Sequence, residues 1–252
     1  MAILYVASEA FELEPFAGLL TGLRKLKWPI DYAYEGIWEG RRVMLAANGA
    51  GPRLATRAVE VAIRAVTAAE LSASKLEAII CTGLCGGLDP ALRENQLVIA
   101  DEILDSATGE RFSCMPLGGA GGNEIVSGLI VTQDRVANDV SEKEKLRALG
   151  AIAVDMEAAG VAARAKRAGL PFSCIKVVSD RADESFTLDL NRMRSAEGRI
   201  ARGKIGIYAL THPAAIPGLF RLKRRAADAA HALGEFLVTC RINSEPEPAH
   251  TE

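Results

Sequence analysis

The sequence lacks any apolar run long enough to cross a membrane, and it lacks an excess of charge of either sign. Its longest apolar stretches have the length of strands, well short of the ~20 residues that a membrane-spanning helix requires. The net charge at pH 7 is -2, so the overall balance gives no reason to expect nucleic acid or another polyanion as a partner. These absences favour a soluble globular protein without a nucleic-acid partner.

Cysteine is also scarce. The five cysteines are an odd number scattered through apolar segments, which argues against a disulfide scaffold. Cys81 and Cys85 have a spacing seen in redox or metal pairs, but no other Cys or His clusters near them, so apolar packing is the better interpretation. Residues 1–7 lack the basic region of a signal peptide and are typical of a first strand. We therefore expect a reduced, cytoplasmic protein without a metal site.

Short apolar runs alternate with helical patterns along most of the 252 residues. Strand–helix–strand alternation indicates an α/β fold, and we expect a three-layer α/β/α arrangement with a central mixed, mostly parallel sheet. The expected strands are 3–7, 34–38, 42–47, 77–82, 97–100, 128–132, the run ending at Glu157, and 172–178, and the expected helices are 16–26, 54–69, 141–149 and 157–168. Ser141 with Glu144 has the spacing of a capping box.

We expect a single domain over residues 1–240. Its part from about 189 is patterned as helix, with breaks at His212-Pro213 and Pro217-Gly218. Residues 241–252 are polar and contain proline, which predicts a disordered tail. Residues 108–123, including the glycine-rich 117–123, have no periodicity and predict a mobile loop, either a lid or a connector.

Two apolar runs end abruptly in acidic residues. One leads into Asp155-Met156-Glu157, and the other ends at Ser179-Asp180. In open α/β sheets the strand ends are where ligands bind, so two carboxylates at neighbouring strand ends are candidates for a site. The alternative for Glu157 is a polar residue in the first turn of a helix, which the helix dipole would favour.

These motifs resemble the nucleoside phosphorylase superfamily and, within it, the methylthioadenosine/S-adenosylhomocysteine nucleosidase branch. The resemblance rests on the order of five features, which are a first strand followed by Glu12, the turn 48–51, the glycine loop 82–88, and the motifs 155–159 and 178–180. The segment after Asp189, with residues 196–199, is similar to the hopanoid-associated members of the superfamily. His212, His231 and His250 lie outside the matched segment, which disfavours a histidine-based catalyst.

The resemblance implies cleavage of the N-glycosidic bond of a purine, adenine-type nucleoside. It makes Glu12 the base that activates water and Asp180 the acid that protonates the leaving purine. The expected substrate contacts are Met156 and Glu157 on the ribose, Ser179 orienting Asp180, Val136 and Ala137 clamping the base without an aromatic ring, and Cys85, Gly86 and Asp155 beside them. It also implies a homodimer and no cofactor, while the substituent on the 5′ carbon of the sugar stays open.

The chemistry sets different demands on the carboxyl groups. A proton given to the leaving base accelerates cleavage by ~10² to 10⁴, and for that role burial beside the apolar residues 175–178 should raise the pKa of Asp180. Glu157 should stay ionised, because ribose hydroxyls donate to it and the sugar becomes cationic. Glu14 is a rival to Glu12 for the role of base.

The nucleophile is water or phosphate. Glu9, Glu12 and Glu14 follow the first strand and would repel a phosphate dianion, which favours hydrolysis. Arg53 and Lys176 could hold phosphate or water, so phosphorolysis, with inorganic phosphate as co-substrate, remains the alternative. Leu84 stands where many nucleosidases carry a serine in the glycine loop, which weakens a water-holding network there.

Two further alternatives remain open. One is a nucleoside-binding protein that has lost catalysis, although binding alone requires neither an acid nor a base. The other concerns residues 217–225, where Arg221, Lys223, Arg224 and Arg225 stand beside Leu219, Phe220 and Leu222. That segment predicts a surface helix or an oligomer contact, and less readily a contact with an anionic membrane surface.

Overall fold

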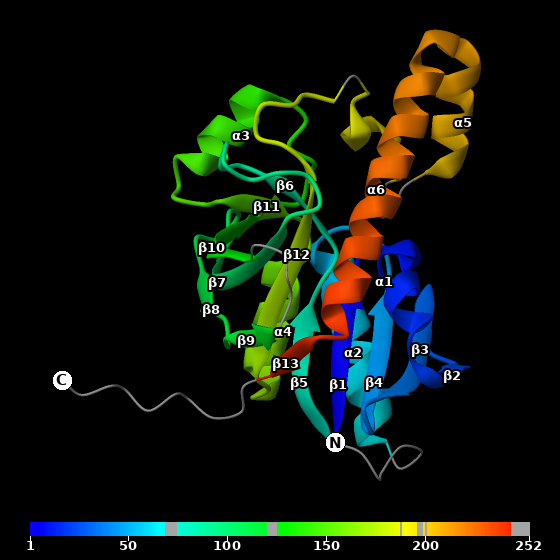
Figure 1. Ribbon diagram of the computed structural model, residues 1–252, viewed down its shortest axis with the longest axis vertical. Helices are drawn as coiled ribbons and strands as arrows, with labels where there is room; N and C mark the ends of the chain where they lie inside the picture. The colour runs from blue at the N-terminus through cyan, green and yellow to red at the C-terminus, as the bar shows by residue number, and fades with distance from the viewer. Residues whose placement is uncertain (69–74, 120–124, 187, 196–198, 200, 243–252) are drawn as a thin grey trace, which may run out of the picture.

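The computed structural model describes residues 1–68, 75–119, 125–186, 188–195, 199 and 201–242 (Figure 1). Its main sheet has 11 strands in the order β2-β3-β4-β1-β5-β12-β6-β11-β10-β7-β8. The strands are β1 (Ala2–Ala7), β2 (Thr21–Lys25), β3 (Tyr32–Trp38), β4 (Arg41–Ala47), β5 (Leu76–Cys81), β6 (Leu84–Gly87), β7 (Leu97–Asp105), β8 (Arg111–Ser113), β10 (Ile125–Thr132), β11 (Ala153–Asp155) and β12 (Phe172–Asp180). β9 (Leu117–Gly119) pairs with β13 (Cys240–Ile242) in a separate small sheet.

Most strand pairs of the sheet are parallel, with antiparallel pairs at both edges and, inside the sheet, at β6–β11 and β7–β12. β1 pairs in parallel with β4 and β5, and β12 continues in parallel with β5 and β6. The β2–β3–β4 meander and the β7–β8 hairpin close the two edges in antiparallel fashion. The predicted central mixed sheet is confirmed.

Helices cover both faces of the sheet. They are α1 (Ala10–Ala17), α2 (Pro52–Thr67), α3 (Val140–Arg147), α4 (Ala158–Ala168), α5 (Arg202–Thr211) and α6 (Ile216–Leu237), with 3-10 turns η2 (Leu190–Met193) and η3 (Pro213–Ala215). None of the described helices is long and apolar enough to span a membrane. In Figure 1, α5 and the first turns of α6 project beyond the body of the protein.

Alternation along β1 shows how the layers form. All six residues of β1 are buried, and because side chains alternate across a strand, successive residues enter opposite layers. Leu4 and Val6 pack with the apolar residues of α2 and α4, whereas Ile3 and Tyr5 pack with those of α1 and α6. The sheet is therefore covered on both faces, and the predicted three-layer α/β/α fold is confirmed.

Close packing of α2 against α4 positions part of the site. Gly160 in α4 lies so near the start of α2 that a Cβ there would sit 2.3 Å from the Pro52 carbonyl oxygen. The Thr56 hydroxyl also donates to the carbonyl of Gly160, at 3.1 Å. This contact brings the residue before α4, Glu157, next to the glycine turn that precedes α2.

The predicted helix over 16–26 is wrong. α1 ends at Ala17, and Thr21–Lys25 forms the edge strand β2, whose five residues are all exposed. Gly22 has φ +61°, a left-handed conformation that an α-helix cannot contain. An exposed edge strand has no buried apolar face, so hydrophobic periodicity carried no signal for it.

Other predicted boundaries also change. α3 begins at Val140 because the Asp139 side chain, not Ser141, caps it, accepting from the Glu142 N–H at 2.8 Å. The expected loop over 108–123 contains β8 and β9, while 120–124 lie outside the described residues. Pro217-Gly218 does not break a helix but lies in the first turn of α6, where proline is tolerated.

The predicted C-terminal tail, residues 241–252, is described by the structure only at its start. The chain continues as strand through Ile242 in β13, so the first two residues of the expected tail, 241 and 242, are part of a strand. Residues 243–252 lie outside the described residues, as do 196–198, on which much of the resemblance to the hopanoid-associated members rests.

Candidate active site

A cavity of about 240 Å³ opens at the ends of β1, β11 and β12. All ten predicted catalytic and substrate-binding residues line it, namely Glu12, Cys85, Gly86, Val136, Ala137, Asp155, Met156, Glu157, Ser179 and Asp180. Some of them lie in β6, β11 or β12, and the others lie in segments that follow the ends of β1, β10 and β11. This is the position expected for an α/β site. Arg53 and Lys176, the predicted phosphate or water contacts, are not among the lining residues.

Glu12 is held on both carboxylate oxygens. It lies in α1 with only 2% of its surface exposed, and its Oε2 accepts from the N–H of Ser8 at 2.9 Å, the hydroxyl of Ser8 at 2.7 Å and the N–H of Glu9 at 2.8 Å. Its Oε1 accepts from the N–H of Leu84 at 2.9 Å. The rival Glu14 is exposed and does not line the cavity. The geometry therefore favours Glu12 as the base.

Leu84 contributes through its backbone rather than its side chain. The predicted weakness at this position concerned the missing serine hydroxyl, but the N–H of Leu84 fixes Glu12 directly. Gly83, just before it, has φ +115°. The main chain of the glycine loop thus holds the carboxylate of Glu12 in place.

Glu157 and Asp155 share a fully buried lysine. Lys176 Nζ lies 2.9 Å from Asp155 Oδ2 and 3.3 Å from Glu157 Oε2, and it also donates to the carbonyl of Thr82 at 3.2 Å. Burial alone would lower the pKa of Lys176, but the two carboxylates outweigh it and hold that pKa well above the usual range. Lys176 therefore lies behind Glu157 as a fixed positive charge.

The carboxylate of Asp155 accepts three hydrogen bonds from neighbouring segments. Its Oδ1 accepts from the Thr132 hydroxyl at 2.6 Å, and its Oδ2 accepts from the N–H groups of Glu157 and Ala158 at 3.1 and 2.8 Å. The side chain has no exposed surface. Asp155 was predicted as a substrate contact. It is among the residues that line the cavity, and its carboxylate also fixes the turn that presents Glu157.

Burial raises the pKa of Glu157 to about 7, and the neighbouring carboxylates of Asp155 and Glu12 act in the same direction against the opposing effect of Lys176. The N–H of Gly51 donates to Glu157 Oε1 at 3.1 Å and also favours the ionised form. Glu157 was expected to stay ionised. The raised pKa runs against that expectation, because burial favours the neutral form.

Asp180 lies in an ion pair rather than in a purely apolar pocket. Lys143 Nζ in α3 is 2.6 Å from Asp180 Oδ2, and only 1% of Lys143 is exposed. The Ser179 hydroxyl lies 2.7 Å from Asp180 Oδ1 and 3.2 Å from the Cys85 carbonyl. Ser179 thus takes the orienting position predicted for it, whereas the expected environment, set by residues 175–178 alone, omitted the cation.

The segment predicted to clamp the base is held in place by a side chain from η2. The Asn191 side chain in η2 accepts from the N–H of Val136 at 2.8 Å and donates to its carbonyl at 3.0 Å. Val136 and Ala137 line the cavity without an aromatic ring, as predicted. Asn191 was missed because it lies 55 residues from its partner, and nothing in the local sequence marks that contact.

Lys143 was missed for a related reason. The sequence of α3 is mostly charged, which indicates an exposed helix. The one available signal is spacing, because Lys143 falls three residues before Leu146, and these two are the buried residues of α3.

Arginines from the C-terminal segment reach the glycine turn. Arg194 Nη2 bonds to Asp134 at 2.8 Å and to the Ala50 carbonyl at 3.3 Å. Arg199 Nη2 lies 3.4 Å from Asn48 Oδ1 and 3.1 Å from Asp31. By contrast, Arg53 is exposed in the first turn of α2.

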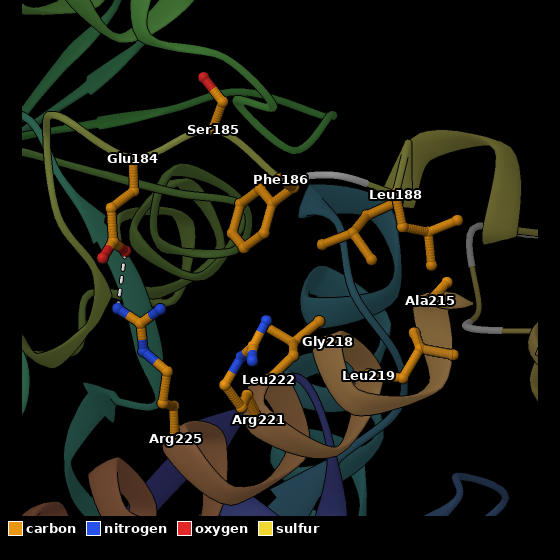
Figure 2. Close-up of a pocket in the computed structure, with 11 residues that line it drawn as sticks. Glu184, Ser185, Phe186, Leu188, Ala215, Gly218, Leu219, Arg221, Leu222 and Arg225 are labelled. Carbon is orange, nitrogen blue, oxygen red and sulfur yellow. Dashed lines mark hydrogen bonds and ion pairs between the residues drawn. The ribbon is translucent and has the colours of Figure 1, made fainter. Parts of the chain in front are cut away.

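A second cavity of about 250 Å³ adjoins the first (Figure 2). The two share Phe186, Leu190 and Leu222. Figure 2 shows the second cavity between the segment of Glu184 to Leu188 and the first turns of α6, with Arg225 paired to Glu184 at 2.6 Å. The site therefore continues into a cleft walled by α6.

Comparison with known proteins agrees with this geometry. A family profile described as "Phosphorylase superfamily" matches residues 2–119 and 116–203. A 5′-methylthioadenosine/S-adenosylhomocysteine nucleosidase from Marinomonas sp. is 31% identical over 175 residues, covering 59% of this chain and 72% of the relative. The corresponding protein of Actinobacillus succinogenes is 26% identical over 211 residues, covering 73% and 87%.

Solved structures share the fold. A nucleosidase of the same name from Neisseria meningitidis, in complex with methylthio-immucillin-A, superposes with a TM-score of 0.70 at 21% identity, covering 94% of this chain and 97% of the other. Futalosine hydrolase of Helicobacter pylori gives a TM-score of 0.69 at 15% identity, covering 95% and 96%.

The chain belongs to the phosphorylase superfamily and, within it, to the branch of the 5′-methylthioadenosine/S-adenosylhomocysteine nucleosidases. The resemblance inferred from the sequence motifs is confirmed.

Proposed function

We propose that this protein is a nucleosidase that hydrolyses the N-glycosidic bond of an adenine-type purine nucleoside and releases the free base and the sugar. The observation that carries the proposal is the set of three carboxyl groups, Glu12, Glu157 and Asp180, around one cavity, each held by different partners. The relatives named above are nucleosidases, which supports the same reaction.

Glu12 is suited to take a proton from water. Its carboxylate is fixed by donors from Ser8, Glu9 and Leu84, so its orientation costs little to maintain during the reaction. A water that gives its proton to Glu12 becomes the nucleophile at the anomeric carbon of the sugar.

In the proposed reaction Glu157 acts on the sugar and Asp180 acts on the purine base. Ionised Glu157 accepts from ribose hydroxyls and stabilises the positive charge that develops on the sugar. Asp180, whose Oδ1 accepts from the Ser179 hydroxyl, protonates the departing purine in this proposal. The C1′–N bond breaks with its electron pair going to the base, and the proton completes the neutral product.

Phosphorolysis is the second candidate, because Arg194 and Arg199 lie at the glycine turn 48–51. A phosphate bound there would use main-chain N–H groups. The N–H of Gly51 already donates to Glu157, Arg194 is paired with Asp134, and Arg199 is paired with Asp31. This arrangement favours water.

We further propose a cytoplasmic homodimer that needs neither a metal nor an organic cofactor, with inorganic phosphate consumed only in the phosphorolytic alternative. The adjoining cleft along α6 is the natural place for the 5′ substituent of the sugar. Methylthioadenosine and adenosylhomocysteine, which appear in the names of the relatives, are the first substrates to try, because they differ in the 5′ substituent.

The test is incubation with adenosine, methylthioadenosine and adenosylhomocysteine, with and without phosphate, followed by chromatography of the products. Free adenine with free sugar in the absence of phosphate is expected. Sugar 1-phosphate formed only with phosphate would replace hydrolysis by phosphorolysis. The variant Asp180→Asn should lose turnover by ~10² to 10⁴, and an unchanged kcat would remove Asp180 from the role of acid.

A further inference from the structure

Asp180, the proposed proton donor, is paired with a lysine from α3, a helix outside the sequence motifs. Lys143 extends from α3 to Asp180 Oδ2 at 2.6 Å, and it also donates to the carbonyl of Arg181. The ring of Phe186 faces the ammonium, with its centroid 5.8 Å from Nζ. Lys143 thus lies among a carboxylate, a carbonyl and an aromatic face, with almost no contact with water.

The buried ion pair between Lys143 and Asp180 contributes little to the stability of the fold. Removing an ammonium and a carboxylate from water carries a large desolvation penalty for each ion, so a buried pair gains little over apolar packing of the same volume. Leu146, on the same face of α3, provides ordinary apolar packing. The position of Lys143 is therefore better explained by what it does to Asp180 during the reaction.

Resting on the proposed function, we propose that Lys143 is a positioning residue that resupplies the proton which Asp180 gives to the leaving base. At rest the ammonium of Lys143 faces the carboxylate of Asp180. As the C1′–N bond breaks, the electron pair stays on the purine, a proton passes from Nζ to Asp180 Oδ2, and Asp180 delivers a proton to the base. Lys143 ends as a neutral amine, Glu12 holds the proton from water, and exchange with solvent restores both.

The proposal predicts dependence on the leaving group. In the variant Lys143→Met, turnover of methylthioadenosine should fall by ~10² or more, because adenine leaves as an anion without a proton. A 4-nitrophenyl riboside with the same 5′ substituent leaves as a stable phenolate, so its turnover should stay within a few-fold of wild type. Lys143→Arg keeps the charge but cannot release a proton, and it should resemble Lys143→Met.

Controls separate this proposal from folding and from the function itself. Lys145→Met, on an exposed position of α3, should leave both rates unchanged. Equal losses on both substrates, or a wild-type rate for Lys143→Arg on methylthioadenosine, would overturn the role of Lys143. Thermal melting identifies a variant that is not folded, and the remaining Lys143 variant then decides. A wild-type protein that releases no base from any nucleoside would instead refute the proposed function.

A separate observation concerns the projecting end formed by α5, η3 and the first turns of α6. Ile207, Leu210 and Phe220 are 65%, 85% and 67% exposed there, which is unusual for large apolar side chains. Residues 202–224 contain five Lys or Arg and no Asp or Glu, although the whole chain has a net charge of -2. Lys223 and Arg224 follow Phe220 by three and four residues, so they share one face of α6.

We infer that this end docks on an anionic bilayer surface. Leu210 and Phe220 would enter the interface, and the basic side chains around them would meet lipid phosphates. The exposed apolar groups favour a bilayer over a nucleic acid, which would engage the charge but leave Leu210 and Phe220 in water.

Sedimentation with vesicles tests this inference. Wild-type protein should bind phosphatidylglycerol vesicles at low salt and not phosphatidylcholine vesicles. Leu210→Ser with Phe220→Ser, and separately Lys223→Glu with Arg224→Glu, should each abolish binding while nucleoside turnover is retained, and Lys145→Glu should bind normally. Absence of binding to anionic vesicles would overturn the inference, as would a change from dimer to monomer in the Leu210 and Phe220 variant without any vesicle binding by wild type.

Discussion

Gly83 lies directly against the carboxylate of Glu12: a Cβ added to Gly83 would sit 2.8 Å from Glu12 Oε1. The φ of Gly83 is +115°, a value that residues with side chains rarely adopt. The next residue, Leu84, donates its N–H to the same oxygen. The glycine loop therefore fixes the proposed base by close contact of main chain and carboxylate.

The first prediction follows from this contact. Gly83→Ala should displace Glu12 and lower kcat by at least tenfold, with a loss of stability of about 1 to 3 kcal/mol from the strained backbone. Gly109→Ala is the matched control, because Gly109 also has a positive φ, +75°, but a Cβ there meets nothing within 4 Å. Equal kcat for both variants, measured together with thermal melting, would show that the contact does not matter for catalysis.

The second prediction separates Glu12 from its neighbour. Glu12→Gln should abolish hydrolysis while sparing nucleoside binding, because the amide keeps the shape of the side chain but cannot take a proton from water. Glu14→Gln, on the exposed face of α1, should retain wild-type turnover. Single-turnover kinetics with a calorimetric Kd would distinguish the two effects, and activity in Glu12→Gln would move the role of base elsewhere.

The third prediction concerns pH. Burial raises the pKa of Glu157 from 4.5 to about 7 in the folded protein. If ionised Glu157 holds the ribose, kcat/KM should rise with pH through about 7, and Glu157→Gln should be poorly active at every pH. A wild-type profile that is flat across this range would contradict the role of Glu157.

The same shift has a consequence for stability. Between pH 4.5 and about 7 the folded state keeps the proton of Glu157 that the unfolded chain has released. The unfolded state then binds fewer protons, so the free energy of unfolding should fall as pH rises through this window. Denaturant titrations should show that Glu157→Gln removes this part of the slope, whatever its effect on catalysis.

Sequence patterns predicted the sheet and the strand-end carboxylates because these depend on local signals. Continuous apolar runs marked β1 and β12, and acidic residues at strand ends marked Glu157 and Asp180. β2 was not predicted, because the residues of this edge strand are all exposed and show no apolar periodicity.

The partners of the carboxylates could not be predicted in the same way. Lys143 meets Asp180 across 37 residues, and Asn191 meets Val136 across 55. Lys143 lies in α3 and Asn191 in η2, so only the tertiary fold brings these side chains to their partners. The sequence therefore indicated which groups line the candidate site, but not the charges that surround them.

The final prediction concerns the lysine beneath Glu157. Lys176→Met should destabilise the protein by about 3 to 5 kcal/mol, because removing one partner of a buried pair leaves Asp155 as an uncompensated buried charge. Lys166→Met is the control: Lys166 pairs with Glu110 at 3.0 Å but is 67% exposed, so its loss should cost less than about 1 kcal/mol. Urea denaturation of both variants at pH 7 measures the difference. Near-equal stabilities would contradict the inference that the ammonium of Lys176 compensates the buried carboxylates of Asp155 and Glu157.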